Sequence, residues 1–264
     1  MEIVRNLDNY ARRSEYNENG FIIEKQFFDK NEISLLLEQI KTVFGFQMER
    51  KGLASGPVDF QHSLYQFFKQ DFLIFKNCGK QVQHLVDLWR LSLSEEVITY
   101  LIDVCGITFP SVATRPVVMF NSKNLATNET YHTVQAHQDA ASMQGSDNAV
   151  VTWIPLIDIE LELGPLKVVP KSHKGGVWAK EIDEFGFGCV PEGTFKEEDF
   201  ISLSNLEAGD IVFFNSKLVH KSGNLSCNDI RWTAQFRYND LLESNFIERG
   251  YPHPYVYKPV ALDY

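Results

Sequence analysis

The order of hydrophobic patterns along the chain is the feature that most restricts its fold. Helical spacing dominates residues 1–106, whereas residues 107–240 contain short runs of β-branched and aromatic residues separated by turn residues. No helical pattern separates those short runs, so the crossover helices of a parallel sheet are missing. The order predicts a mainly β protein whose core is an antiparallel, cupin-like jelly roll supported by N-terminal helices.

Two helical patterns stand out in the N-terminal part. Apolar residues at helical spacing cover residues 33–43, and Asp29 and Glu32 precede or begin this run as a capping signal. A second pattern covers about residues 80–104. Because no linker interrupts the chain, we expect one domain over residues 1–264. Its expected parts are a largely helical part (1–106), the jelly-roll core (107–240) and a C-terminal tail (241–264).

Strand-like segments fill the second half of the chain. Gly-Pro, Gly-Asp and Gly-Asn pairs mark turns between them. The expected strands are residues 116–120, 149–156, 166–170, 211–214 and 231–238.

Composition narrows the class of protein. Of 264 residues, 44% are hydrophobic and 23% charged, as in a globular chain with a sizeable core. No apolar run approaches 18 residues and the N-terminus lacks an apolar stretch, so we expect neither a membrane span nor a secretory signal. A net charge of −10 argues against nucleic-acid and anionic-membrane partners. Four scattered cysteines without a CxxC motif predict reduced thiols and a cytoplasmic location.

One short motif carries side chains suited to a metal. His137 and Asp139 are two residues apart, and in an extended segment they face the same side. His220, which follows a strand-like segment, is the best candidate for a third ligand. Two histidines and one carboxylate leave three metal positions open, as in non-haem Fe(II) oxygenases. The alternatives are an ordinary polar pair on a surface loop and, for His220, a structural histidine.

The strand-like segment at 231–238 carries two arginines. Arg231 and Arg237 share one face with Thr233 and Gln235, while apolar and aromatic residues occupy the other. An arginine facing an interior needs an anion, and its planar guanidinium suits a carboxylate. The strand by itself also allows a simpler alternative, in which the arginine face is exposed to solvent and only the aromatic face is buried.

Seven short motifs follow one another in a recognisable order. They are His137-Gln-Asp139, Trp153-Ile-Pro-Leu156, Gly164-Pro-Leu166, Val169-Pro-Lys-Ser-His173, Ala208-Gly-Asp210, His220-Lys-Ser222 and Arg231. In this order and spacing the chain resembles the phytanoyl-CoA dioxygenase family over about residues 107–240. The resemblance implies a double-stranded β-helix and an oxygenase that uses Fe(II), O₂ and the co-substrate 2-oxoglutarate. Such an enzyme couples oxidative decarboxylation of 2-oxoglutarate to succinate with oxidation of a second molecule.

Carried over by position, the resemblance makes His137, Asp139 and His220 the iron ligands and implies no further catalytic residue. Family members that halogenate lack the carboxylate ligand, whereas this chain keeps Asp139. The resemblance therefore implies hydroxylation, or a related oxidation such as desaturation or ring closure.

The resemblance also implies a co-substrate site. Arg231 would bind the distal carboxylate of 2-oxoglutarate, with help from the Ser222 hydroxyl. Trp153 would form part of the adjoining wall. Gln135 would contact the co-substrate or the substrate, with core packing as its alternative.

Several residues are expected to surround the site rather than form it. His173 is interpreted as structural, and Lys171 replaces the usual glycine of the family's Pro-Gly-Ser-His turn, which puts the geometry of that turn in question. The polar segment 122–131 is the candidate lid. The tail 246–264 is expected to cover one end of the barrel, with a loosely packed terminus as the alternative.

The substrate is the least defined part of the prediction. Arg237 could contact an anionic substrate group or form a structural ion pair, and Gln235 is a tentative polar contact. A small polar metabolite is the expected partner, and no oligomeric state is predicted. The alternatives are a non-catalytic metal- or sugar-binding jelly roll, a protein side-chain hydroxylase, and a zinc hydrolase, which would not need Arg231.

Overall fold

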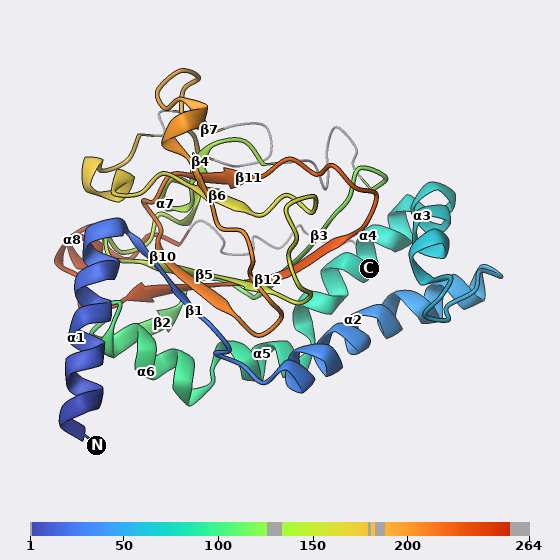
Figure 1. Ribbon diagram of the computed structural model, residues 1–264, viewed down its shortest axis with the longest axis horizontal. Helices are drawn as coiled ribbons and strands as arrows, with labels where there is room; N and C mark the ends of the chain where they lie inside the picture. Colours follow the sequence, from blue (N-terminus) through green and yellow to red (C-terminus); the bar gives the residue numbers. More distant parts are fainter. Residues whose placement is uncertain (1, 126–133, 179–180, 183–187, 254–264) are drawn as a thin grey trace, which may run out of the picture.

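The computed structural model describes residues 2–125, 134–178, 181–182 and 188–253 (Figure 1). Helices dominate up to residue 103, and strands dominate after it, as the sequence predicts. The helices are α1 (Glu2–Asn19), α2 (Lys30–Arg50), α3 (Phe60–Gln70), α4 (Phe72–Gln81), α5 (Val86–Ser92), α6 (Glu95–Asp103), α7 (Asp139–Met143) and α8 (Ser244–Glu248). Short 3₁₀ turns are η1 (Val82–His84), η2 (Ser172–Gly175) and η3 (Glu197–Asp199).

The strands form two antiparallel sheets. The first has the order β1-β10-β5-β12-β2, with β3 also paired to β12, and the second has the order β7-β8-β4-β11-β6-β9. The first sheet contains β1 (Phe21–Glu24), β2 (Pro110–Val112), β3 (Val117–Asn121), β5 (Val150–Pro155), β10 (Ile211–Asn215) and β12 (Arg231–Asp240). The second contains β4 (His137–Gln138), β6 (Leu166–Val168), β7 (Glu181–Ile182), β8 (Gly188–Cys189), β9 (Ile201–Ser202) and β11 (His220–Ser222). The predicted combination of helices with antiparallel sheets is confirmed.

Helix α2 forms where the sequence predicts it and extends further at both ends. The Asp29 carboxylate caps it by accepting a hydrogen bond from the Asn31 N–H at 2.7 Å. Ile33, Ile40 and Phe44 are completely buried at helical spacing. This face packs on the first sheet, so burial of the apolar stripe rather than helix propensity stabilises α2.

The helical pattern at 80–104 is divided into shorter pieces. Leu85 adopts an extended conformation between η1 and α5, and Ser94 does so between α5 and α6. Ser94 then caps α6 by accepting from the Val97 N–H. The apolar spacing continues across both breaks, which is why the sequence suggests a single long helix.

The two faces of β12 are covered by different layers (Figure 1). Trp232, Phe236 and Tyr238 belong to the core cluster shared with the N-terminal helices. On the opposite face, which is turned towards the second sheet, Arg231 is 4% exposed. The alternative in which the arginine face meets solvent is therefore wrong, because the second sheet covers it.

No helix in the described parts of the chain combines the length and the apolarity needed to cross a bilayer.

Candidate metal centre and adjoining cavity

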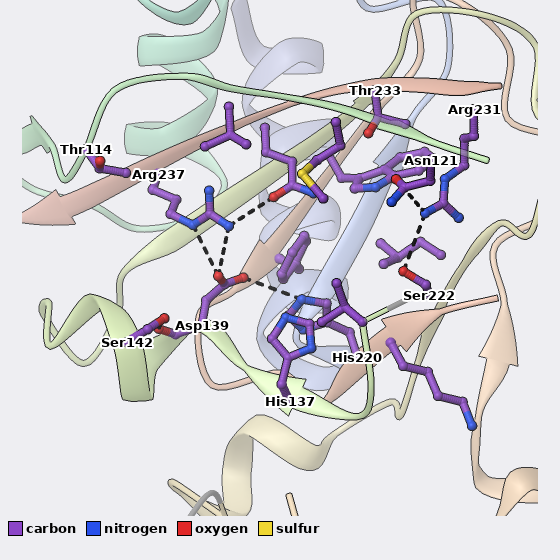
Figure 2. Close-up of a pocket in the computed structure, with 18 of the residues that line it drawn as sticks. Thr114, Asn121, His137, Asp139, Ser142, His220, Ser222, Arg231, Thr233 and Arg237 are labelled. Atoms are coloured by element: carbon purple, nitrogen blue, oxygen red, sulfur yellow. Dashed lines mark hydrogen bonds and ion pairs between the residues drawn. The ribbon is translucent and has the colours of Figure 1, made fainter. Parts of the chain in front are cut away.

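The three predicted ligands converge between the sheets. Strands β4 and β11 are neighbours with His137 opposite His220, and the two rings lie 4.1 Å apart between centroids. Asp139 opens α7 instead of continuing the strand, yet its carboxylate still reaches the histidines. One donor atom from each residue lies within 4.8 Å of the others, and all three residues are buried (Figure 2). The surface-loop alternative is therefore wrong.

Backbone carbonyl groups orient both imidazole rings. His137 Nδ1 lies 2.8 Å from the Gln135 carbonyl oxygen, and His220 Nδ1 lies 2.9 Å from the Leu218 carbonyl oxygen. Each carbonyl favours a proton on Nδ1, so Nε2 is the nitrogen that carries a lone pair for a metal. The same device, a carbonyl two residues earlier, serves both rings.

The Asp139 carboxylate is divided between two tasks. Its Oδ1 accepts hydrogen bonds from Arg237 Nε at 3.1 Å and Arg237 Nη2 at 2.9 Å. Its Oδ2 is buried, has no hydrogen-bond partner and lies 3.4 Å from His220 Nε2. Arg237 Nη2 also donates to Gln235 Oε1 at 2.9 Å. Arg237 thus forms the ion pair that was one of its two interpretations, while contact of Arg237 or Gln235 with a substrate stays a prediction.

The ligands have the charge states that a metal requires. Burial and the neighbouring His220 lower the pKa of His137 to about 3, and burial also lowers the pKa of His220. Burial acts to raise the pKa of Asp139, but Arg237 and the two histidines outweigh it and lower that pKa to about 2. Near neutral pH the site therefore presents two neutral imidazoles and one carboxylate.

These pKa shifts predict how the metal-free protein responds to acid. Below pH 6.5 the unfolded chain takes up protons on both histidines, whereas burial opposes this in the folded chain. The free energy of unfolding of the metal-free protein should therefore decrease as the pH is lowered. Melting temperatures measured in a chelator between pH 7 and 5 should show this slope. Variants His137→Asn and His220→Asn should flatten it, and the surface variant His84→Asn should not. An unchanged slope in both ligand variants would contradict the assignment.

Arg231 is a buried cation without a carboxylate partner among the described residues. Its Nη1 donates to the Gly164 carbonyl oxygen, and its Nη2 donates to Asn121 Oδ1 at 3.2 Å and to Ser222 Oγ at 3.4 Å. Its Nε has no partner. Burial lowers the pKa of Arg231 to about 10, so the guanidinium stays charged near neutral pH. A desolvated cation held in this way is suited to a carboxylate from a ligand.

Asn121 is a site residue that the sequence interpretation missed. It lies opposite Arg231 on β3, is 1% exposed, and its Nδ2 has no hydrogen-bond partner. A second unpartnered donor beside Arg231 strengthens the preference for an anion at this place. The alternation of residues along the predicted strand at 116–120, extended by one residue, could have identified Asn121.

A cavity of about 350 Å³ joins the metal centre to Arg231. Three residues of the sequence prediction, Trp153, Ser222 and Gln235, line it together with Asn121, and Figure 2 shows the labelled side chains around it. Gln135 does not: its side chain is exposed and lines a separate surface pocket. The chain before β4 is irregular, so the alternation that would turn Gln135 inward does not extend to it.

Gly164, whose carbonyl oxygen accepts a hydrogen bond from Arg231, lies where a side chain does not fit. Its φ of +64° is in the left-handed region, and a Cβ there would lie 2.5 Å from the Gly223 carbonyl oxygen. A residue with a Cβ loses about 1–2 kcal/mol in the left-handed conformation alone. Because the Cβ would also clash here, we expect Gly164→Ala to lower the free energy of unfolding by more than that. Gly52→Ala is the matched control, because Gly52 has a φ of +74° and no atom within 4 Å of its Cβ position. Urea denaturation of both variants checks this, and equal losses would contradict the steric argument.

The turn with the atypical lysine keeps a glycine-like conformation. Lys171 has φ +66°, the left-handed value that glycine adopts most easily, and its Nζ pairs with Glu18 Oε1 at 2.6 Å. His173 belongs to η2 and contacts the end of α1, with its Nε2 3.2 Å from the Asn17 carbonyl oxygen, consistent with a structural role. Residues 126–131 of the candidate lid and 254–264 of the tail lie outside the described residues. In the described part of the tail, Phe246 is buried.

Comparison with known proteins places these features in a family. The profile described as Phytanoyl-CoA dioxygenase (PhyH) matches residues 16–232. The chain is 24% identical over 224 residues to the human peroxisomal phytanoyl-CoA dioxygenase, covering 83% of this chain and 64% of that protein. It is 29% identical over 99 residues to the 1-deoxypentalenic acid 11-beta-hydroxylase of Streptomyces exfoliatus, covering 35% of each. The matched regions thus span less than two thirds of these relatives.

Solved structures share the fold at low identity. The epimerase SnoN in complex with Fe³⁺, alpha-ketoglutarate and nogalamycin RO has a TM-score of 0.60 and 15% identity, covering 89% of this chain and 84% of that chain. EctD from S. alaskensis with 2-oxoglutarate and 5-hydroxyectoine has a TM-score of 0.56 and 13% identity, covering 88% and 76%. With a family profile that matches most of its length, this chain belongs to the phytanoyl-CoA dioxygenase family.

Proposed function

We propose that the protein is an Fe(II)- and 2-oxoglutarate-dependent oxygenase that hydroxylates a small molecule. The observation that carries the proposal is that one cavity contains two groups of side chains: first the three candidate metal ligands, and second the buried Arg231. Two neutral histidines and a carboxylate oxygen without a hydrogen-bond partner lie in it, and so does a buried arginine that has no acidic partner among the described residues. A zinc hydrolase has a use for the first group only. The second group therefore favours the oxygenase.

His137, Asp139 and His220 fit a divalent iron. They offer two nitrogen donors and one oxygen donor, and the unpartnered Asp139 Oδ2 is the atom that a cation would satisfy. When bound, iron and 2-oxoglutarate would supply the oxidising chemistry: O₂ is the oxidant, 2-oxoglutarate loses CO₂ and takes up one oxygen atom to become succinate, and the other oxygen atom enters a C–H bond of the second molecule.

Arg237 holds Asp139 in the orientation that this chemistry needs. Arg237 Nε and Nη2 both donate to Oδ1 of Asp139, so Oδ2 is the carboxylate oxygen that faces His220. A carboxylate that offers only Oδ2 would leave more positions on a metal free for the co-substrate and O₂.

Arg231 orients the co-substrate from the other end. Its guanidinium and the Ser222 hydroxyl would bind the distal carboxylate, and the Asn121 amide would add a donor. The buried Trp153 ring forms a wall beside them and excludes water. The site residues do not distinguish hydroxylation from desaturation or ring closure, and the epimerase SnoN shares the fold. Hydroxylation is therefore proposed from the relatives that are named as hydroxylases.

The remaining expectations are proposals of the same kind. We propose that the helices and the two sheets form one jelly-roll domain, since one core cluster joins the helices to the first sheet and a second cluster joins the first sheet to the second. The four scattered cysteines, which form no CxxC motif, favour a reducing, cytoplasmic location.

The proposal is tested by anaerobic titration of the metal-free protein with Fe(II) and then with 2-oxoglutarate. A weak visible charge-transfer band is expected only when both are present. Succinate release in air should then follow, and a screen of small molecules should find those that stimulate it. Iron binding without the charge-transfer band, or no iron binding at all, would contradict the proposal and favour a non-catalytic binding protein.

A further inference from the structure

The cationic side chains of the cavity differ in how they are neutralised. Arg237 is paired with a metal ligand, and Lys221 Nζ is paired with Glu197 Oε2 at 2.5 Å. Arg231 faces the proposed position of the co-substrate carboxylate. Arg115 also lines the cavity, but no carboxylate of the described residues lies within ion-pair distance of it. Once iron and 2-oxoglutarate are accounted for, this positive charge remains without a counterpart.

Arg115 lies at the opposite end of the cavity from Arg231. Val117, Met119 and Asn121 alternate along β3 and line the cavity, and Arg115, two residues before the strand, lines it as well. Asn121 pairs with Arg231, whereas Val117, at the other end of β3, lies about 13 Å away along the strand, and Arg115 precedes Val117 by two residues. Figure 2 shows Thr114 beside Arg237 on the far side of the metal ligands from Asn121 and Arg231.

The guanidinium of Arg115 is held in place although it is exposed. Its Nε donates to Gln83 Oε1 at 2.8 Å, and Gln83 Nε2 in turn donates to the Gly79 carbonyl oxygen at 3.0 Å. Fixing Nε leaves the two Nη groups as a fork for a carboxylate and lowers the entropy cost of binding one. The Thr114 hydroxyl lines the cavity beside it and offers a further donor.

Apolar side chains line the wall of the cavity. They are Val117, Met119, Trp153, Leu166 and Phe214. We propose that the substrate is a small apolar carboxylic acid whose carboxylate binds Arg115 and Thr114 and whose apolar body extends towards the metal ligands. This inference rests on the proposed function and adds the substrate class to it.

The test uses protein loaded anaerobically with Fe(II) and saturating 2-oxoglutarate, so that the Arg231 end is filled. The probes are octanoate and cyclohexanecarboxylate, each compared with its own carboxamide by isothermal titration calorimetry. Each acid should bind at least about tenfold more tightly than its amide, as expected for hydrogen bonds between charged groups. Arg115→Gln should reduce that ratio to about one, and Arg115→Lys should restore part of it.

Arg90→Gln is the matched control, because Arg90 is exposed on α5, where it pairs with Asp87 at 2.8 Å. It should leave the acid-to-amide ratio unchanged. Equal binding of acid and amide, a ratio unaffected by Arg115→Gln, or no binding of either acid would overturn the inference. The charge-transfer band, recorded on the same samples, separates the two claims. If the band forms and the preference is missing, the substrate class is wrong while the oxygenase remains.

Discussion

Asp139→Ala is expected to abolish succinate formation and to reduce the affinity for Fe(II) by at least about 100-fold. Loss of partners outside the ligand set already costs about 10–100-fold in metal affinity at such sites, and this variant removes a ligand. His220→Ala should act in the same way, since it removes one of the two nitrogen donors. Metal binding by equilibrium dialysis and succinate release by chromatography are the measurements.

Folding has to be separated from metal binding in Asp139→Ala. The variant leaves the buried Arg237 without its carboxylate, and breaking a buried ion pair typically costs about 3–5 kcal/mol. Asp139→Asn keeps the shape and an oxygen acceptor, so it should fold better and still lose most of the iron affinity. Asp87→Ala, which breaks the surface pair with Arg90, is the control and should bind iron normally. Full succinate formation by folded Asp139→Ala or His220→Ala would exclude these residues as ligands.

Arg231→Ala is expected to raise the 2-oxoglutarate concentration needed for half-maximal succinate formation by about 30-fold or more. Truncating one partner of a buried charge pair costs about 2–5 kcal/mol, and about 1.4 kcal/mol corresponds to a tenfold change in affinity. Fe(II) affinity should stay close to that of the unchanged protein, because Arg231 contacts none of the three ligands.

Arg231→Lys refines the test. Lysine keeps the charge but not the planar fork, so its requirement for 2-oxoglutarate should lie between those of the unchanged protein and Arg231→Ala. Asn121→Ala, which removes the second unpartnered donor, should raise the requirement by a smaller factor. An Arg231→Ala protein with an unchanged requirement would place the carboxylate elsewhere.

Local patterns predicted much of this molecule. The capped apolar stripe of α2 and the alternation along β12 are set by neighbouring residues, so both could be identified before the fold was known. The same patterns could not show that helix 80–104 is broken, because Leu85 and Ser94 leave the apolar spacing intact. Nor could they show that Gln135 is exposed, since that depends on where β4 begins.

The sequence by itself determined the chemistry that the chain can offer: two histidines and a carboxylate in a family motif, with an arginine on a later strand. Only the tertiary structure decided how these groups are used. Whether Arg237 meets an anion depends on the approach of α7 to β12, across 98 residues of sequence. Whether Arg231 is desolvated depends on the second sheet covering its face. Burial and long-range pairing are properties of the packed layers, and no local spacing encodes them.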